Sequence, residues 1–188
     1  MACSSRSVEI YPTGPDSAIA IRLKSPRSEC SMIYRSWSIP RSILETTETA
    51  FRSGHHEVFA IWTALLNPTD LECKILRCVI PEQSPGSNSY GEFVHIPGAE
   101  LSRIQVDNFN RGERSVVQLH THPSEDVRMS GLDRSWEVVI QEGALSIIVP
   151  NYCRESLLGF SGANVYEREG NDWRLWSSDE INQRIKII

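Results

Sequence analysis

We infer the fold first from residues 116–149, which read VVQLHTHPSEDVRMSGLDRSWEVVIQEGALSIIV. The apolar run from Val116 to His120 predicts a short strand, and it leads directly into a polar loop that contains Pro123. A second run, Leu145 to Val149, is apolar except for Ser146, as expected of a buried strand. Between the two strands, apolar residues recur at helical spacing: Leu132, Trp136, Val139 and Ile140. This stretch therefore predicts strand, loop, helix and strand in that order.

An amphipathic helix and two paired strands are predicted upstream of this stretch. Ser38 is a candidate N-cap, and Pro40 fits the first turn of a helix that ends at Gly54. The apolar face of this helix would be formed by Ile43, Leu44, Thr47 and Phe51. The almost continuously apolar run 57–66 is typical of a strand buried on both faces, and residues 71–80 alternate enough to pair with it.

Shorter elements are predicted in the rest of the chain. Residues 81–89 contain two prolines, one glycine and three serines and predict a loop, whereas residues 90–96 predict a strand. Pro97 would open a helix that ends at residues 110–112, with an apolar face formed by Leu101, Ile104, Val106 and Phe109. The remaining expected elements are strands at 164–168 and 173–176, a terminal helix from Ser178, and a hairpin or edge strands at 8–11 and 18–23.

This alternation of strands and helices predicts an α/β (α+β) fold, in which a central mixed sheet is flanked by helices. A chain of 188 residues and 21.3 kDa fits a single domain with one hydrophobic core. We place this domain at residues 38–188 and treat residues 1–37 as an N-terminal extension.

Composition limits the class of partner and the compartment. The formal net charge of -5 and the pI near 5.6 argue against a broad surface for nucleic acid or anionic membrane. No apolar stretch is long enough for a spanning helix or a secretory signal. The five cysteines contain no C-x-x-C pair and are expected to be reduced thiols, so the sequence predicts a cytoplasmic protein.

A candidate metal site lies at the end of the strand predicted at residues 116–120. His120 and His122 stand two residues apart at its end, so both imidazoles can lie on the same side of the strand. Ser130 is a natural N-cap for a helix that starts at Gly131, and this places Asp133 in the first turn, where its carboxylate can point back toward the histidines. Two histidines and one carboxylate suit zinc and leave a fourth position for water.

Peptide hydrolysis at such a site also needs a group that takes a proton from water and passes it to the leaving amine. Glu57 is the candidate, because it is an acidic residue at the mouth of the most apolar strand, where sheet stability does not call for a charge. Glu48 and Glu45 remain alternatives.

In the types and spacing of these residues, the sequence resembles the JAMM metalloprotease family, also called the JAB/MPN domain. The motif of this family is an upstream glutamate, then H-x-H-P, six residues and S-x-x-D. The second block is matched at every fixed position: His120, His122, Pro123, Ser130 and Asp133. The first block is looser, because no glycine follows Glu57 closely. The resemblance covers roughly residues 38–150 and implies a curved sheet flanked by helices.

The resemblance also implies roles for these residues. His120, His122 and Asp133 would bind one zinc ion per chain. Glu57 would act as general base and then acid, and Ser130 would hydrogen-bond the oxyanion or the zinc water.

The substrate implied by the resemblance is a ubiquitin-like protein with an extended C-terminal tail, after which family members cleave peptide or isopeptide bonds. The chain is most similar to prokaryotic JAB-domain proteins of the deubiquitinase type, some of which belong to bacterial defence operons. A catalytically silent MPN scaffold and a RadC-like, DNA-associated protein are the alternatives. A second metal site at His55 and His56 is not expected, and the tryptophans are interpreted as packing residues.

Overall fold

The computed structural model describes residues 34–67, 71–88, 91–135 and 137–188. The predicted hairpin at 8–11 and 18–23 and the side chain of Trp136 lie outside the described residues. The division at residue 37 is therefore still a prediction, although the first described strand already begins at Ser36.

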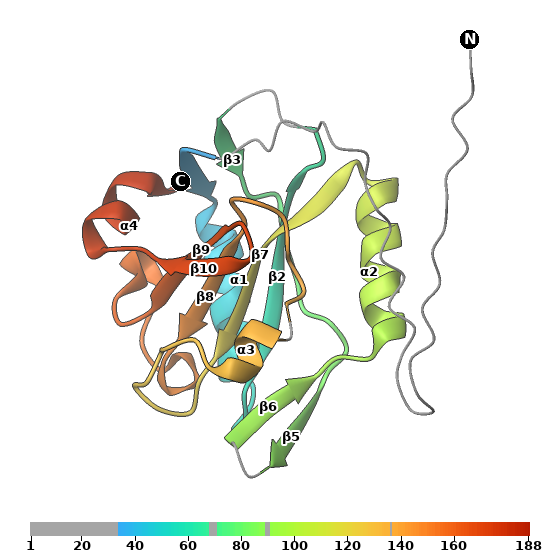
Figure 1. Ribbon diagram of the computed structural model, residues 1–188, viewed down its shortest axis with the longest axis vertical. Coiled ribbons are helices and arrows are strands. Elements are labelled where there is room, and N and C mark those ends of the chain that lie inside the picture. The colour runs from blue at the N-terminus through green and yellow to red at the C-terminus, as the bar shows by residue number, and fades with distance from the viewer. Residues whose placement is uncertain (1–33, 68–70, 89–90, 136) are drawn as a thin grey trace. The chain divides into compact units, whose positions relative to one another are not determined.

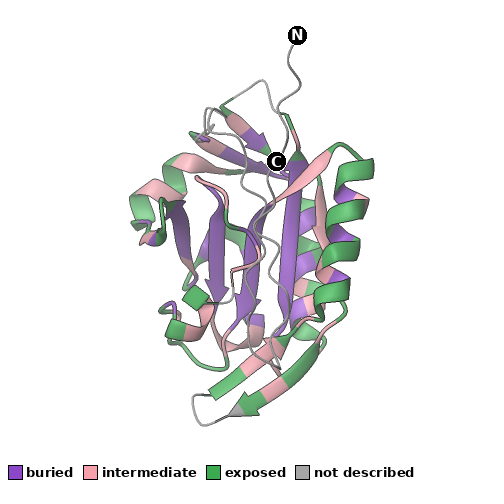
Figure 2. Cartoon of the chain, turned by 45° about the vertical axis from the view of Figure 1, so that its right-hand side comes forward, coloured by how far each residue is buried: buried purple, intermediate pink, exposed green. Residues whose placement is uncertain are grey.

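A six-stranded mixed sheet forms the centre of the fold (Figure 1). β7 and β8 pair in parallel, and all other neighbours in this sheet pair antiparallel. The order across the sheet is β10 (Asp172–Leu175), β9 (Asn164–Glu169), β8 (Leu145–Val149), β7 (Glu113–Thr121), β2 (Phe59–Leu65) and β4 (Arg77–Val79). The inner strands are buried almost throughout, and this confirms the predicted mixed sheet and its buried strands (Figure 2).

A smaller parallel sheet contains β11 (Ile185–Ile187), β1 (Ser36–Ile39) and β3 (Glu72–Lys74). Two expectations are wrong here. Ser38 lies inside β1 and caps no helix, because α1 (Arg41–Arg52) begins after Pro40. The run 71–80 divides between the two sheets, so only its second half, β4, pairs with β2.

Helices cover both faces of β2. On one face, α1 buries Ile43, Leu44, Thr47 and Phe51 as predicted, and the Thr47 hydroxyl accepts a hydrogen bond from Trp62 Nε1 at 2.9 Å. On the other face, Ile104 of α2 (Gly98–Asn110) packs against Phe59 and Ile61, which alternate with Trp62 along the strand.

The apolar face predicted for α2 is partly wrong. Val106 is 61% exposed and Phe109 is 74% exposed. The buried residues are Glu100, Ile104 and Asn108, a row at i and i+4. The two polar members of this row are satisfied by Arg103 and Arg77, so the helix packs through ion pairs and hydrogen bonds as well as apolar contact.

A β-hairpin, β5 (Ser84–Asn88) and β6 (Gly91–His95), replaces the loop predicted at 81–89 (Figure 1). Gly86 lies opposite Phe93, and a Cβ atom at Gly86 would collide with the phenyl ring. The hairpin is more exposed than the central sheet, as Figure 2 shows, and it extends beyond the end of that sheet.

The remaining helical segments are short. α3 (Gly131–Ser135) ends five residues before Ile140, so the predicted longer helix is wrong. The side chain of Gln118 accepts the backbone N–H groups of Val138 and Val139 at 3.0 and 3.1 Å and holds this segment out of helical geometry. η1 (Asn151–Cys153) and η2 (Leu158–Phe160) follow β8, and α4 (Ser178–Arg184) begins where predicted, with a capping box between Ser177 and Glu180. Within the described ranges, no helix is long and apolar enough to cross a membrane.

Candidate active site

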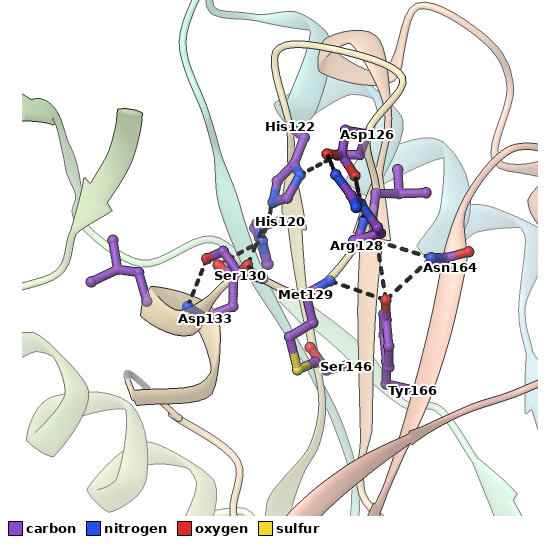
Figure 3. A network of polar contacts seen from close by, with 12 residues as sticks. His120, His122, Asp126, Arg128, Met129, Ser130, Asp133, Ser146, Asn164 and Tyr166 are labelled. Atoms are coloured by element: carbon purple, nitrogen blue, oxygen red, sulfur yellow. Dashed lines mark hydrogen bonds and ion pairs between the residues drawn. The ribbon is translucent and has the colours of Figure 1, made fainter. Parts of the chain in front are cut away.

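The end of β7 carries both histidines of the motif. His120 lies in the strand and is 6% exposed, and the N–H of His122 donates to the carbonyl of Val149 at 2.8 Å. The two side chains point to the same side, as expected for positions i and i+2, and their Nε2 atoms lie 3.1 Å apart (Figure 3).

Asp133 approaches the histidines from the first turn of α3. Its Oδ1 lies 3.2 Å from His120 Nε2, and its Oδ2 lies 3.6 Å from His122 Nε2. Ser130 and Asp133 also cap each other: the Ser130 hydroxyl accepts the Asp133 N–H at 3.1 Å, and Asp133 Oδ2 accepts the Ser130 N–H at 2.7 Å. The structure therefore brings His120, His122 and Asp133 together at one point, and Ser130 fixes the carboxylate.

Sequence reasoning missed the residues that position the loop before Ser130. The Tyr166 hydroxyl accepts the N–H of Met129 at 3.0 Å, and Asn164 Nδ2 donates to the carbonyl of Val127 at 3.0 Å (Figure 3). Both side chains come from β9, far from the motif in sequence, and no spacing rule connects them to it. They hold the loop against the sheet, so α3 starts at a fixed place.

The orientation of His122 is set by the loop itself. Its Nδ1 donates to the backbone carbonyl of Asp126 at 2.6 Å, and this bond turns the ring so that Nε2 faces Asp133 and His120. The Asp126 carboxylate pairs with Arg128 at 2.7 Å, and this guanidinium holds the pKa of Asp126 well below its usual range. Only the carbonyl of Asp126 is directed at the site.

The donor set fits a zinc ion. Two imidazole nitrogens and a carboxylate oxygen are ligands that zinc accepts, and bonds of 2.0–2.1 Å in a tetrahedron place neighbouring ligand atoms about 3.3 Å apart. The observed separations of 3.1, 3.2 and 3.6 Å are close to this value. Among the described residues, this is the one group of metal-ligating side chains that converge.

The charges of the site favour cation binding. Burial opposes ionisation of Asp133, but hydrogen bonds from His120 and His122 outweigh it and hold the pKa of this carboxyl far below its usual range. Burial likewise opposes a charge on His122, yet the neighbouring Asp133 carboxylate and the Asp126 carbonyl raise the pKa of this imidazole overall. A fixed negative charge therefore stands beside two imidazoles.

Glu57 lies near this group, at the entrance to β2. Burial raises the pKa of its carboxyl to about 7; the charge of His122 opposes the rise, and those of Asp133 and Glu92 add to it. The two alternatives point elsewhere. Glu48 accepts the N–H of Leu157 at 2.6 Å and pairs with Arg52, and Glu45 is exposed on α1.

An open groove of about 370 Å³ begins at Glu57 and runs along the β5–β6 hairpin. Its walls are formed by His56, Glu57, Pro85, Gly86, Ser87, Glu92 and Phe93. The sequence predicted a loop at residues 81–89 but did not identify Glu92 and Phe93 as groove residues, because their partners lie across the hairpin.

The histidines, cysteines and tryptophans outside the motif have surroundings typical of residues with a structural role. His56 Nδ1 lies 3.0 Å from the carbonyl of Glu57, and within the described ranges no metal-ligating group includes His55 or His56. Burial raises the pKa of Cys73 to about 12 and that of Cys153 to about 11, as expected for inert thiols. The described tryptophans are core residues: Trp37, Trp62, Trp173 and Trp176.

Comparison with known proteins supports a metalloprotease. A protein of Sinorhizobium fredii described as probable metalloprotease y4jG is 33% identical over 157 residues, which cover 81% of this chain and 94% of the relative. No protein-family model matches the chain.

Comparison with solved structures concerns the fold. A protein from Desulfitobacterium hafniense has a TM-score of 0.50 at 11% identity, and the match covers 81% of this chain and 92% of that protein. A structure described as a metalloprotease-like JAMM zinc site in the proteasome and signalosome gives a TM-score of 0.43 at 17% identity, with 81% and 98% covered. A JAB1/MPN domain protein from Archaeoglobus fulgidus gives 0.45 at 18% identity, with the same coverage.

The fold and the site define a metal-dependent hydrolase of the metalloprotease class. The His and Asp residues of the expected motif converge in the structure, the charges of His122 and Asp133 act on Glu57, and the Sinorhizobium relative is described as a probable metalloprotease. The chain belongs to the family of this probable metalloprotease, and its residues His120, His122, Pro123, Ser130 and Asp133 match the motif of the JAMM (JAB/MPN) metalloproteases.

Proposed function

We propose that this protein is a zinc-dependent isopeptidase that cleaves after the C-terminal tail of a ubiquitin-like protein in the cytoplasm. The observation that carries the proposal is the meeting of His120, His122 and Asp133 at one point beside a half-buried glutamate and an open groove. One zinc ion per chain would be held by these three side chains.

Glu57 is the proposed proton carrier. When bound, zinc supplies a Lewis acid for the scissile carbonyl and lowers the pKa of a water toward about 7. A carboxyl whose own pKa lies near 7 is well matched to take a proton from that water and return it to the leaving amine. Glu57 is the carboxylate, among the three considered, whose surroundings include His122 and Asp133.

Ser130 is proposed to act in two ways. Its hydroxyl accepts the N–H of Asp133 and so keeps the carboxylate aimed at the histidines. A hydroxyl can accept and donate at the same time, so the same group can also donate to a developing oxyanion. The cap is therefore compatible with the catalytic role inferred from the motif.

The groove supports an extended tail as substrate. β5 and β6 pair with each other and form a two-stranded sheet, and an extended peptide can add to the edge of such a sheet through backbone hydrogen bonds. Among the described residues that line the groove, Glu57 and Glu92 are acidic and none is a lysine or arginine. This balance favours a tail that carries a cationic residue next to small glycines.

A bacterial conjugation or defence pathway is the proposed setting, and the bacterial source of the Sinorhizobium relative is consistent with it. The genes beside this one provide a direct check. An adjacent ubiquitin-like protein with activating and conjugating enzymes would support the proposal.

The test of the proposed substrate uses a panel of ubiquitin and prokaryotic ubiquitin-like and sulfur-carrier proteins, each with a lysine-linked fluorescent peptide at its C-terminal glycine. We expect the zinc-loaded protein to release the fluorophore from at least one of them, and chelation or His120→Ala to abolish release. If the zinc-loaded protein cleaved an internally quenched casein peptide but no member of the panel, the substrate class would be wrong.

A further inference from the structure

Besides the packing of Val94 against the cluster of Phe59, Ile61 and Ile104, side-chain hydrogen bonds join the β5–β6 hairpin and its base to the rest of the protein at two places. At its base, the side chain of Gln83 exchanges hydrogen bonds with the backbone of Phe59 at 2.7 and 3.0 Å. Near its far end, the hydroxyl of Tyr152 donates to Glu92 Oε2 at 2.9 Å. Among the described residues, this is the one hydrogen bond from the two hairpin strands to another element. We call it the Tyr152–Glu92 clasp.

Tyr152 belongs to a turn with an unusual backbone. Asn151, Tyr152 and Cys153 all have positive φ angles, of 52°, 52° and 58°. Side chains disfavour this left-handed region, at a cost on the order of 1 kcal/mol or more for a residue such as tyrosine. A chain that keeps three such residues in succession needs other contacts to hold them.

Those contacts come from the catalytic side of the molecule. The N–H of Tyr152 donates to the carbonyl of His122 at 3.0 Å, and the N–H of Asn151 donates to the carbonyl of Ser124 at 3.1 Å. Arg52 Nε donates to the carbonyl of Cys153 at 2.7 Å. The turn is therefore fixed to the loop that carries His122, and its tyrosine spans from there to the hairpin.

We propose that Tyr152 is a positioning residue for substrate binding, which acts by holding the β5–β6 hairpin through Glu92 at a fixed distance from the histidine loop. The proposal rests on the proposed function, because the hairpin is taken there as the wall that receives the substrate tail. Tyr152 connects the histidine loop to the hairpin, and the tail would lie between these two segments. The backbone N–H of Tyr152 donates a hydrogen bond to the carbonyl of His122, and its hydroxyl donates one to Glu92.

Two further observations agree with this role. Glu92 is one of the residues that line the groove, so the clasp fixes a groove residue and not a remote part of the hairpin. Partial burial and the charges of Glu92 and Glu57 raise the pKa of the Tyr152 hydroxyl, so it stays protonated and keeps donating at neutral pH. Glu57, the proposed proton carrier, lines the same groove as Glu92.

The experiment compares Tyr152→Phe, Glu92→Ala and the double variant, all loaded with zinc, against the most rapidly cleaved substrate of the panel. Tyr152→Phe removes one oxygen atom and leaves the ring in place. We expect KM to rise about fivefold to tenfold and kcat to stay within about twofold, because the lost bond is one hydrogen bond to a charged acceptor. The double variant should be no worse than Glu92→Ala alone, because Glu92→Ala already removes the acceptor of the Tyr152 hydroxyl.

Glu92→Gln keeps an acceptor oxygen for the Tyr152 hydroxyl and should keep amide exchange of the hairpin within about twofold of the wild-type rate. Tyr34→Phe is the matched control, because the Tyr34 hydroxyl accepts from Arg114 at 2.8 Å and is not bonded to the hairpin. It should leave KM unchanged. A rise in KM that is equal in Tyr34→Phe and Tyr152→Phe would overturn the proposal, since it would reflect general destabilisation.

Amide hydrogen exchange of residues 84–95 provides a readout that needs no substrate. We expect Tyr152→Phe to speed exchange in the hairpin about fivefold and to leave β7 and β8 unchanged. If the wild-type protein cleaves no member of the panel, the proposed substrate class fails and the exchange rates alone decide on the clasp. Unchanged amide exchange of the hairpin in Tyr152→Phe would refute the proposed role of Tyr152, whether or not a substrate of the panel is cleaved.

Discussion

Replacement of Glu57 by glutamine should make the metal-free protein more stable at alkaline pH. Burial raises the pKa of Glu57 from an ordinary 4.5 to about 7, so the folded protein binds this proton more tightly than the unfolded chain does. The favourable contribution is fully present below about pH 4.5 and is lost as the pH rises through about 7. Glutamine has nearly the same shape and carries no charge, so Glu57→Gln should not show this loss.

The size of the effect follows from the same pKa. A rise from 4.5 to about 7 corresponds to at most about 3.4 kcal/mol. Since Glu57 is only partly buried and solvent screens its charge, we expect about 1–2 kcal/mol. The free energy of unfolding of Glu57→Gln, relative to wild type, should therefore increase by this amount between about pH 5 and about pH 8.5.

Urea unfolding in the presence of a chelator measures this difference at both pH values. Glu125→Gln is the matched control, because Glu125 is an exposed carboxylate on the loop beside the site. Its stability relative to wild type should be the same at both pH values. If the difference between Glu57→Gln and wild type were also independent of pH, the buried, proton-retaining carboxyl inferred for Glu57 would be wrong.

Three further predictions concern the hairpin, the core and the metal. Gly86→Ala should push the Phe93 ring aside, destabilise the hairpin by about 1–2 kcal/mol and speed its amide exchange, whereas unchanged exchange would show that the ring has room. Gln118→Leu should cost about 2–3 kcal/mol in urea unfolding, because it leaves the N–H groups of Val138 and Val139 without their acceptor; a cost below about 1 kcal/mol would contradict this. The zinc affinity should fall as the pH is lowered, because protons compete with the ion for its histidine and carboxylate ligands, and an affinity that is independent of pH on dialysis would contradict this ligand set.

The central strands and the metal-binding motif could be predicted because local sequence specifies them. The apolar runs at 57–66 and 145–149 become β2 and β8, and the spacing from His120 to Asp133 places three side chains at one point. Neither prediction needed to know which strands pair. Both depend on burial and on the direction of side chains within one or two elements.

The elements that the sequence did not reveal depend on distant partners. Residues 84–88 read SPGSN and suggest a loop, yet they form β5 because β6 pairs with them and Gly86 leaves room for Phe93. The helix predicted through Ile140 ends at Ser135 because a side chain of β7 takes the N–H groups that follow. Such contacts are set by tertiary structure and leave no period in the sequence.

The Tyr152–Glu92 clasp could not be predicted from the sequence for a similar reason. None of the residues 151–153 is a glycine, which would have indicated a left-handed turn. The hydrogen-bond partners that hold this turn lie at positions 52, 122 and 124. Asn164 and Tyr166, which fix the loop before Ser130, are also distant from the motif in sequence. The convergence of His120, His122 and Asp133 could be predicted from the sequence, whereas the residues that position them could not.

The most direct test of the account measures zinc content and cleavage together in Glu57→Gln. His120, His122 and Asp133 are intact in this variant, so we predict about one zinc ion per chain, as in wild type, and loss of at least about 100-fold in kcat on the cleaved substrate. Cleavage by Glu57→Gln at the wild-type rate, with zinc bound, would contradict the assignment of Glu57 as the proton carrier of this metalloprotease.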